Sequence, residues 1–222
     1  MTDADLTYRS PNHNDRPDGA VPRVIVIHYT AMDSAEAAME RLCAEEFKVS
    51  AHWLICERGK AYAMVDEERR AWHAGIGRWR DWEDVNAVSI GIELANLGDR
   101  PFPQAQMQAL ERLIDAIRGR WNIAAEDVIG HSDLSPGRKE DPGPRFDWAR
   151  LARAGRAGQA GQGTADRVDM ESFLARARAA GWTADGDEDD ADILDAVRLR
   201  FRPWARGRVL QRQDIEVLPE SS

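Results

Sequence analysis

The sequence has few cysteines and no long apolar run. Its two cysteines, Cys43 and Cys56, do not form a CxxC motif, so a thiolate zinc site is not expected. A disulfide between them would need an oxidising compartment, and we interpret both as small core residues. No stretch approaches the ~20 apolar residues of a membrane helix, so no membrane span is expected.

The chain also has no excess of positive charge. The formal net charge is -9, whereas nucleic-acid binding depends on cations that contact phosphate. A nucleic-acid partner is therefore not expected. Lysine is scarce, since only Lys48, Lys60 and Lys139 occur. In a chain that uses arginine for nearly every other cation, a lysine inside a motif suggests a specific role.

The first residues lack the pattern of an export signal. Residues 1–10 are polar and acidic, with no basic segment followed by an apolar one. If Met1 is the native start, we expect a cytoplasmic protein; a chain trimmed of its signal would be periplasmic. Residues 1–22, which contain three prolines, are expected to form an extended arm.

Strand-like and helix-like patterns alternate over the first two thirds of the chain. Buried strands are predicted by apolar, β-branched runs at residues 23–28, 87–94 and 128–133, and a hairpin by two runs within 51–65. Helices are predicted from the apolar spacing at residues 35–47, capped by Asp33 or Ser34, and at 107–121, after Pro103. This alternation predicts an α/β fold with a central mixed β-sheet flanked by helices.

The composition changes after residue 154. Residues 155–167 are rich in Gly, Ala and Gln, which predicts a flexible linker that packs poorly. Beyond the linker, apolar spacing predicts helices near residues 170–177, 193–201 and 214–218. We therefore expect two domains, over residues 1–154 and 168–222, the second small and helical.

The acidic run at residues 185–192 resembles a calcium-binding loop only in composition. An EF-hand loop requires glycine at its sixth position and glutamate at its twelfth, and Asp190 and Ala196 stand there instead. We expect this run to be a solvated loop between helices.

Two of the five histidines stand where strand patterns end. His28 follows VIVI and His131 follows VIG, and a rigid strand end holds a ligand side chain well. A catalytic zinc takes three protein ligands and keeps a fourth position for water. The candidate third ligands are Asp133, Glu140 and Asp141. Spacing alone does not choose among them, and it does not separate a metal site from two core histidines.

Six segments of the chain form a recognisable series: SPNHNDRP (residues 10–17), VIVIHYTAM (24–32), VSAHWLI (49–55), AWHAG (71–75), SIGIELAN (89–96) and GHSDLSPGRKEDPGPRFDW (130–148). These segments resemble the zinc amidases of the AmpD/AmiD type, a family related to the phage lysozyme amidases and the peptidoglycan recognition proteins. They occur in the family's order and cover about residues 10–150. The resemblance implies hydrolysis of the amide bond between N-acetylmuramic acid and L-alanine in peptidoglycan fragments.

The same resemblance implies the roles of five residues. In the family, the histidines of the HYT and GHSD motifs and the aspartate of RKxDPGP hold zinc; here these are His28, His131 and Asp141. The glutamate of SIGIEL, Glu93, is implied as the acid/base residue, and the lysine of RKxD, Lys139, as the group that stabilises developing charge. None of the five positions is substituted. A Zn2+ cofactor is therefore expected.

Other residues near these motifs have two interpretations. The loop of residues 72–86 holds three tryptophans, which either stack on sugar rings or pack the loop, and we expect Trp79 to line the cleft. His73 either touches substrate or makes a structural hydrogen bond. His52 is expected to pack beneath the sheet, and Asp133 to orient a ligand or cap the loop.

The expected substrates are soluble muropeptides, notably 1,6-anhydro-muramyl peptides in peptidoglycan turnover and recycling. One alternative is a recognition module that binds muropeptides without cutting them, and another is an envelope amidase that acts on intact sacculi. The intact set of five residues favours catalysis, because a binding module has no need of it.

The second domain resembles the small helical domain of AmiD-type enzymes, which is similar to peptidoglycan-binding modules. Most of the similarity lies in LDAVRLRFRP (residues 194–203). Two roles are open to this domain: it binds glycan, or it buttresses the catalytic domain.

Overall fold

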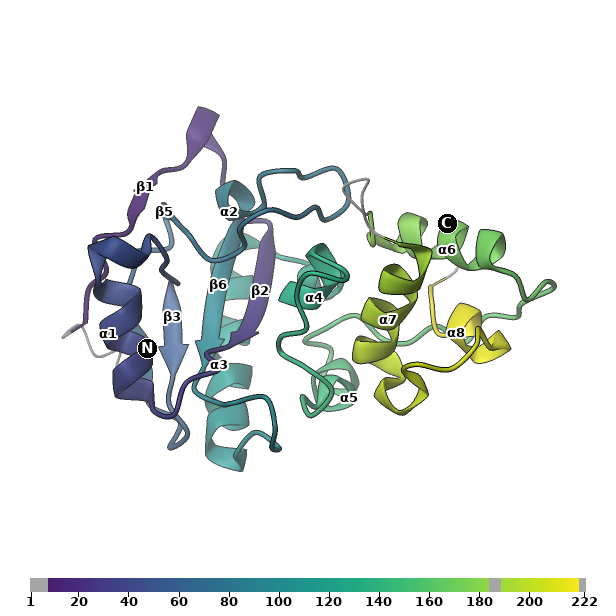
Figure 1. Cartoon of the computed structure of the whole chain (residues 1–222). Coiled ribbons are helices and arrows are strands. Elements are labelled where there is room, and N and C mark those ends of the chain that lie inside the picture. The colour runs from purple at the N-terminus through teal and green to yellow at the C-terminus, as the bar shows by residue number, and fades with distance from the viewer. Residues whose placement is uncertain (1–7, 184–188, 220–222) are drawn as a thin grey trace.

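The computed structural model describes residues 8–183 and 189–219. It has a sheet-containing part and, beside it, a group of helices from the C-terminal third of the chain (Figure 1). The first half of the acidic run predicted as a solvated loop, residues 185–188, lies outside the described residues. Its second half is not a loop: Asp189 is the N-cap of a helix that begins at Asp190. Within the described ranges, no helix has the length and apolarity to cross a membrane.

The central sheet has five strands in the order β4-β3-β6-β2-β7. The four strands β3 (Trp53–Ile55), β6 (Ser89–Leu94), β2 (Val24–Tyr29) and β7 (Val128–Gly130) are parallel, and β4 (Ala61–Ala63) pairs antiparallel with β3. The predicted mixed sheet and the predicted hairpin are therefore confirmed. In the register of the two central strands, His28 stands opposite Glu93, so these side chains emerge on the same face of the sheet.

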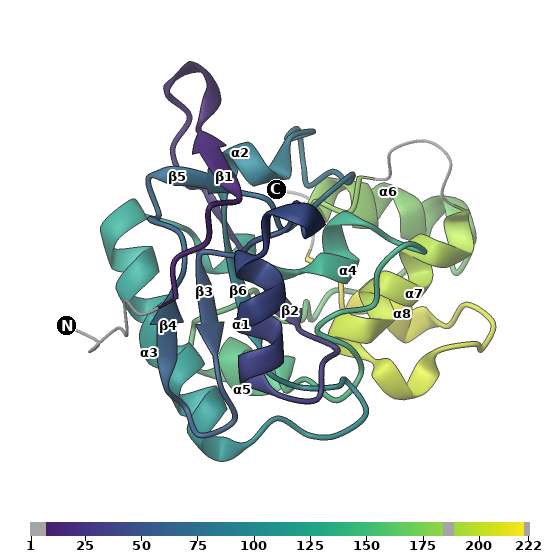
Figure 2. The same cartoon turned by 60° about the vertical axis from the view of Figure 1, so that its left-hand side comes forward.

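Alternation along β2 assigns its side chains to two cores. Ile25 and Ile27 pack toward the long helix α3 (Gln104–Trp121), while Val24 and Val26 face the C-terminal helices. Helix α1 (Ala35–Cys43) covers β3 and β4 on the face opposite α3 (Figure 2). His28 continues the series of Val24 and Val26, so its imidazole emerges on the face that α3 leaves uncovered.

Three predicted boundaries are wrong by a few residues. The strand predicted at residues 87–94 begins at Ser89, because Asp84 caps the short helix α2 (Val85–Val88) just before it. The strand predicted at residues 128–133 ends at Gly130, and helix α4 (His131–Leu134) follows directly. The helix predicted at residues 35–47 ends at Cys43, followed by a separate 3-10 turn, and Ser34 is its N-cap.

Part of the N-terminal arm joins a small sheet. Strand β1 (His13–Asp15) pairs antiparallel with β5 (Arg69–Ala71). The next residue, Arg16, donates hydrogen bonds to the backbone carbonyls of Glu67, Asn86, Ala87 and Ser89. The predicted extended arm is thus held against the residues that lead into β6.

The C-terminal helices pack on the sheet domain rather than apart from it. They are α5 (Trp148–Arg153), α6 (Met170–Ala180), α7 (Asp190–Phe201) and α8 (Arg212–Glu216). We call α6, α7 and α8, with the described residues that connect them (168–183 and 189–219), the helical unit. Its apolar residues share one buried cluster with Val24, Val26 and Ile129 of the sheet.

The predicted linker is irregular but packed. Residues 155–167 contain no helix or strand, yet Ala157 and Ala165 are buried in the two cores that the segment joins. The Gly161 N–H donates to the carbonyl of Val217 at 2.7 Å, and a Cβ on Gly161 would meet the backbone of Leu218. The expectation that this segment packs poorly is therefore wrong, because its small residues permit close backbone approach.

Candidate metal centre

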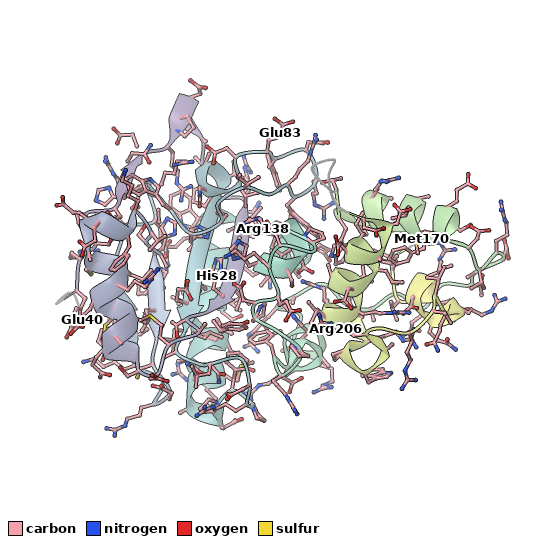
Figure 3. The ribbon with its side chains drawn as sticks, in the orientation of Figure 1. His28, Glu40, Glu83, Arg138, Met170 and Arg206 are labelled. Carbon is pink, nitrogen blue, oxygen red and sulfur yellow. The ribbon has the colours of Figure 1, made fainter. Side chains whose placement is uncertain are left out.

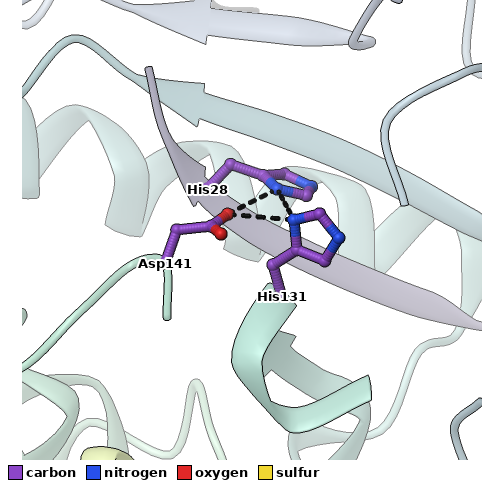
Figure 4. Close-up of side chains that lie close together, drawn as sticks. All are labelled: His28, His131 and Asp141. Atoms are coloured by element: carbon purple, nitrogen blue, oxygen red, sulfur yellow. Dashed lines mark hydrogen bonds and ion pairs between the residues drawn. The ribbon is translucent and has the colours of Figure 1, made fainter. Parts of the chain in front are cut away.

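Three side chains from separate parts of the chain converge at the C-terminal ends of β2 and β7. The Nδ1 atoms of His28 and His131 lie 3.0 Å apart, and the Oδ2 atom of Asp141 lies 2.8 Å from the first and 3.1 Å from the second (Figure 4). His28 is the next-to-last residue of β2, His131 begins α4, and Asp141 lies in the loop that follows α4. His131 and Asp141 thus form one buried group with His28, from which they are 103 and 113 positions away in the sequence.

The hydrogen bonds around the two imidazoles fit a bound cation. The Nε2–H of His131 donates to the Ala74 carbonyl at 2.8 Å, which leaves Nδ1 with a lone pair in the neutral ring. The Nε2 atom of His28 lies 3.1 Å from Nδ1 of His73, so its Nδ1 atom is likewise free to act as a donor to a metal. Three electron-pair donors that face one another this closely fit a single cation between them. Two imidazoles and one carboxylate are the donor set of many catalytic zinc sites.

The ionisation of the group agrees with this fit. Burial lowers the pKa of His28 to about 4, although the contact of its Nδ1 atom with Asp141 opposes the shift. Burial alone would raise the pKa of Asp141, but its contacts with the imidazoles of His131 and His28 bring it well below its usual range. A neutral imidazole and an ionised carboxylate are the forms that bind a metal.

Two further histidines support this group from behind. His73 connects His28 to Ser89, whose Oγ atom lies 3.1 Å from Nε2 of His73. His73 therefore takes the structural hydrogen bond that the sequence left as one of two interpretations, although it also borders the cleft. His52 is fully buried and accepts a hydrogen bond from the Gly91 N–H at 2.9 Å, as expected of a residue that packs on the sheet.

A cleft of about 440 Å³ opens over the three converging residues. Glu93 lies on its floor and Lys139 on its rim. The Oε2 atom of Glu93 is buried and has no hydrogen-bond partner in the described part of the chain. Burial raises the pKa of Glu93 to about 8, with a further increase from the charge of Asp141 and an opposing effect from Lys139. An unpaired carboxyl beside a converging donor set indicates a group kept for chemistry.

The structure also chooses among the three candidate third ligands. Asp133 points away from the histidines, and its carboxylate accepts hydrogen bonds from Gly130 N–H and Trp182 Nε1. Glu140 is exposed and pairs with Arg206. Only Asp141 of these three reaches the two Nδ1 atoms.

The prediction that Trp79 lines the cleft is wrong. Its side chain is 1% exposed, packs edge-to-face on Trp182 with ring centres 5.2 Å apart, and donates from Nε1 to Asp127. The cleft wall is formed instead by Trp72, next to His73, and by Arg41 of α1. Trp72 was a candidate in the same loop, whereas nothing in the local pattern separates Arg41 from other surface arginines.

The burial of Trp79 leads to a stability prediction. Trp79→Ala is expected to lower the free energy of unfolding by about 3–5 kcal/mol, because it removes a buried indole from the contact with the helical unit. Thermal and denaturant unfolding measure this change. A stable Trp79→Ala protein whose only defect is a raised KM for substrate would return Trp79 to the cleft.

Comparison with known protein families adds to this geometry. The sequence profile described as N-acetylmuramoyl-L-alanine amidase matches residues 18–144. The N-acetylmuramoyl-L-alanine amidase AmiD of Escherichia coli (strain K12) is 34% identical over 215 residues, covering 83% of this chain and 77% of AmiD. The 1,6-anhydro-N-acetylmuramyl-L-alanine amidase AmpD of Enterobacter cloacae is 33% identical over 159 residues, covering 64% of this chain and 85% of AmpD.

Solved structures extend the similarity to the helical unit. Escherichia coli AmiD, in complex with the substrate anhydro-N-acetylmuramic acid-L-Ala-D-γ-Glu-L-Lys, superposes with a TM-score of 0.79 at 31% identity, covering 92% of this chain and 90% of AmiD. AmpDh3 of Pseudomonas aeruginosa superposes with the same TM-score at 30% identity, covering 98% and 96%. The fold, the cleft and the matches along most of the chain agree, and the chain belongs to the N-acetylmuramoyl-L-alanine amidase family.

Proposed function

We propose that this amidase is zinc-dependent and cleaves the bond between the lactyl group of N-acetylmuramic acid and L-alanine in muropeptides, with 1,6-anhydro-muramyl peptides as preferred substrates. The observation that carries the proposal is the convergence of His28, His131 and Asp141 beneath a cleft that also contains Glu93 and Lys139. The anhydro preference is supported by the AmiD substrate complex and by the names of the AmpD relatives.

His28, His131 and Asp141 would hold the zinc ion. When bound, zinc supplies Lewis-acid chemistry: it lowers the pKa of a water molecule toward ~7 and polarises a carbonyl. The chain itself supplies the orientation of the ligands. The Ala74 carbonyl fixes the ring of His131 and His73 fixes the ring of His28, so that both Nδ1 atoms face Asp141.

Glu93 would act as the proton carrier of the reaction. Its carboxyl lies in the cleft with one oxygen unpaired, and burial raises its pKa to about 8. A nearby divalent cation would lower that value again, toward the range where one carboxyl can both accept and return a proton near neutral pH. In this role Glu93 takes the proton of the attacking water and delivers it to the amine of the departing L-alanine.

Lys139 would stabilise the negative charge that develops on the carbonyl oxygen during attack. It stands on the exposed rim of the cleft, two positions before Asp141, and its charge lowers the pKa of Glu93 across the cleft. A cation at this place acts on the transition state more than on the neutral amide of the substrate.

Lys139→Ala is expected to lower kcat roughly 100- to 1000-fold, the usual loss for one group that stabilises an oxyanion. The variant should keep its fold, because the lysine is exposed. Steady-state kinetics on a muropeptide measures the effect, with Lys60→Ala as a matched control, since Lys60 lies outside the cleft. A Lys139→Ala enzyme with the kcat of the wild type would remove the lysine from the mechanism.

The substrate class is tested by incubation with two substrates, purified anhydro-muramyl peptides and intact sacculi, each with and without a chelator. Mass spectrometry of the products is expected to show free stem peptide from the anhydro-muramyl peptides and no release after chelation. Cleavage of sacculi alone would favour the envelope amidase, and binding without cleavage would favour the recognition module. A role in recycling follows from the preferred substrate, and a cytoplasmic location stays a prediction.

A further inference from the structure

The ligand His131 is anchored through its neighbour Asp133, which takes no part in the proposed chemistry. The Asp133 carboxylate is 1% exposed and receives three donors. Its Oδ2 atom accepts from Gly130 N–H at 2.8 Å and from Arg200 Nη1 at 2.9 Å, and its Oδ1 atom accepts from Trp182 Nε1 at 3.1 Å. Two of the three donors therefore come from the helical unit.

Arg200, near the end of α7, donates hydrogen bonds to one residue before His131 in the sequence and to one residue after it. While its Nη1 atom binds Asp133 in α4, its Nη2 atom donates to the carbonyl of Val128, the first residue of β7, at 3.1 Å. The guanidinium lies 4.3 Å from the ring centre of Trp148, and the residue is 5% exposed. A buried arginine that donates to two acceptors and lies against an indole ring is held rigidly. Arg200 therefore fixes the junction of strand and helix at which His131 stands.

The helical unit also contacts the loop that runs from the end of α4 to Asp141. Arg206, which is labelled near α7 in Figure 3, binds Glu140, the residue between Lys139 and Asp141, and pairs with Asp195 of α7. Gly137 lies so close to Asp192 in the first turn of α7 that a Cβ on it would come within 2.4 Å of the carboxylate. Both segments that carry ligands after β7 are therefore fitted against α7 and the turn that follows it.

We propose that Arg200 is a positioning residue for His131, and that the helical unit serves the metal centre through it. This inference rests on the proposed zinc site. Without Arg200, the Asp133 carboxylate would be buried without its cation, and α4 would have to move or recruit water. Either change would turn the Nδ1 atom of His131 away from Asp141 and weaken the hold on the metal.

The test is Arg200→Met, measured by competition between the full-length protein and a chromogenic chelator for Zn2+. Zinc affinity is expected to fall about 10-fold, within the range typical of lost outer contacts to a metal ligand. At limiting zinc, the variant should also turn over more slowly, because fewer molecules hold the metal. Since only the zinc affinity changes, excess free zinc should restore much of this activity.

The matched control is Arg198→Met. Arg198 stands two residues before Arg200 on the same helix and forms an equally buried ion pair with Asp214, at 2.6 Å, inside the helical unit. Its loss should lower thermal stability, as the loss of Arg200 does, but leave zinc affinity near that of the wild type. Equal losses of zinc affinity in the two variants, or none in a folded Arg200→Met, would overturn the positioning role.

A milder variant decides the case if Arg200→Met does not fold. Trp182→Phe removes the Nε1–H donor to Asp133, makes the buried ring smaller and keeps an aromatic ring against Trp79. A folded Trp182→Phe with weakened zinc binding supports the anchoring of α4 by the helical unit, and one with unchanged zinc binding contradicts it. Failure of the wild type itself to bind zinc would instead refute the proposed function.

Discussion

Glu93→Gln is expected to lower kcat by about 100- to 10 000-fold, the contribution typical of a positioned general acid or base. Glutamine has nearly the same shape as glutamate but does not take up a proton, so the attacking water and the departing amine both lose their proton carrier. The substitution should leave the fold intact, because the buried Oε2 atom of Glu93 has no partner to lose within the described residues. Single-turnover kinetics on an anhydro-muramyl peptide measures the chemical step.

Zinc analysis of the same Glu93→Gln preparation is the control. Glu93 is not one of the three converging donors, so the variant should contain as much zinc as the wild type. A fully zinc-loaded variant that turns over at the normal rate would refute the acid/base role. Loss of zinc together with activity would show that Glu93 serves the metal site instead.

His28→Ala is expected to empty the metal site and to reduce activity to background. In the proposed site, His28 supplies one of the three protein donors that converge among the described residues, and its Nδ1 atom contacts both of the others, so its removal would leave a site with two ligands. Elemental analysis of the purified variant measures the zinc content, and activity is assayed with and without added zinc. The expected loss exceeds that for an outer contact, which is about 10- to 100-fold.

His13→Ala serves as the matched control for this loss. His13 lies in β1, outside the cleft, and contacts Arg69. The His13→Ala variant should keep the zinc content and turnover of the wild type. That result would show that removal of a histidine does not by itself reduce metal content. A His28→Ala protein with full zinc occupancy would contradict the proposed ligand set.

Much of the fold was predictable because its signals are local. The β-branched run that ends at His28 and the helical spacing after Pro103 each depend on neighbouring residues, and both elements are confirmed. The mixed sheet is confirmed as well. The errors at Ser89 and His131 arose where a short helix adjoins a strand, because four residues are too few for a helical period to emerge.

The metal site was predictable only through resemblance. Local pattern placed His28 and His131 at strand ends, but it left Asp133, Glu140 and Asp141 equivalent. The structure distinguishes them by partners that lie far along the chain, namely Arg200 for Asp133 and Arg206 for Glu140.

The same distance in sequence explains the error at Trp79. Its ring is buried by Trp182, which lies in the other half of the chain, and no spacing within the loop of residues 72–86 reports that contact. The error about the packing of residues 155–167 has the same origin. The small residues that suggested flexibility are those that allow the backbone of Gly161 to approach Leu218, which lies far along the chain.

The most direct measurement is an anomalous diffraction map recorded at the zinc absorption edge from crystals of the purified wild-type protein. The expected result is one strong peak between His28 Nδ1, His131 Nδ1 and Asp141 Oδ2, open on its remaining side to the cleft that contains Glu93. A zinc-loaded crystal with its peak elsewhere, or with these three side chains turned apart, would contradict the account.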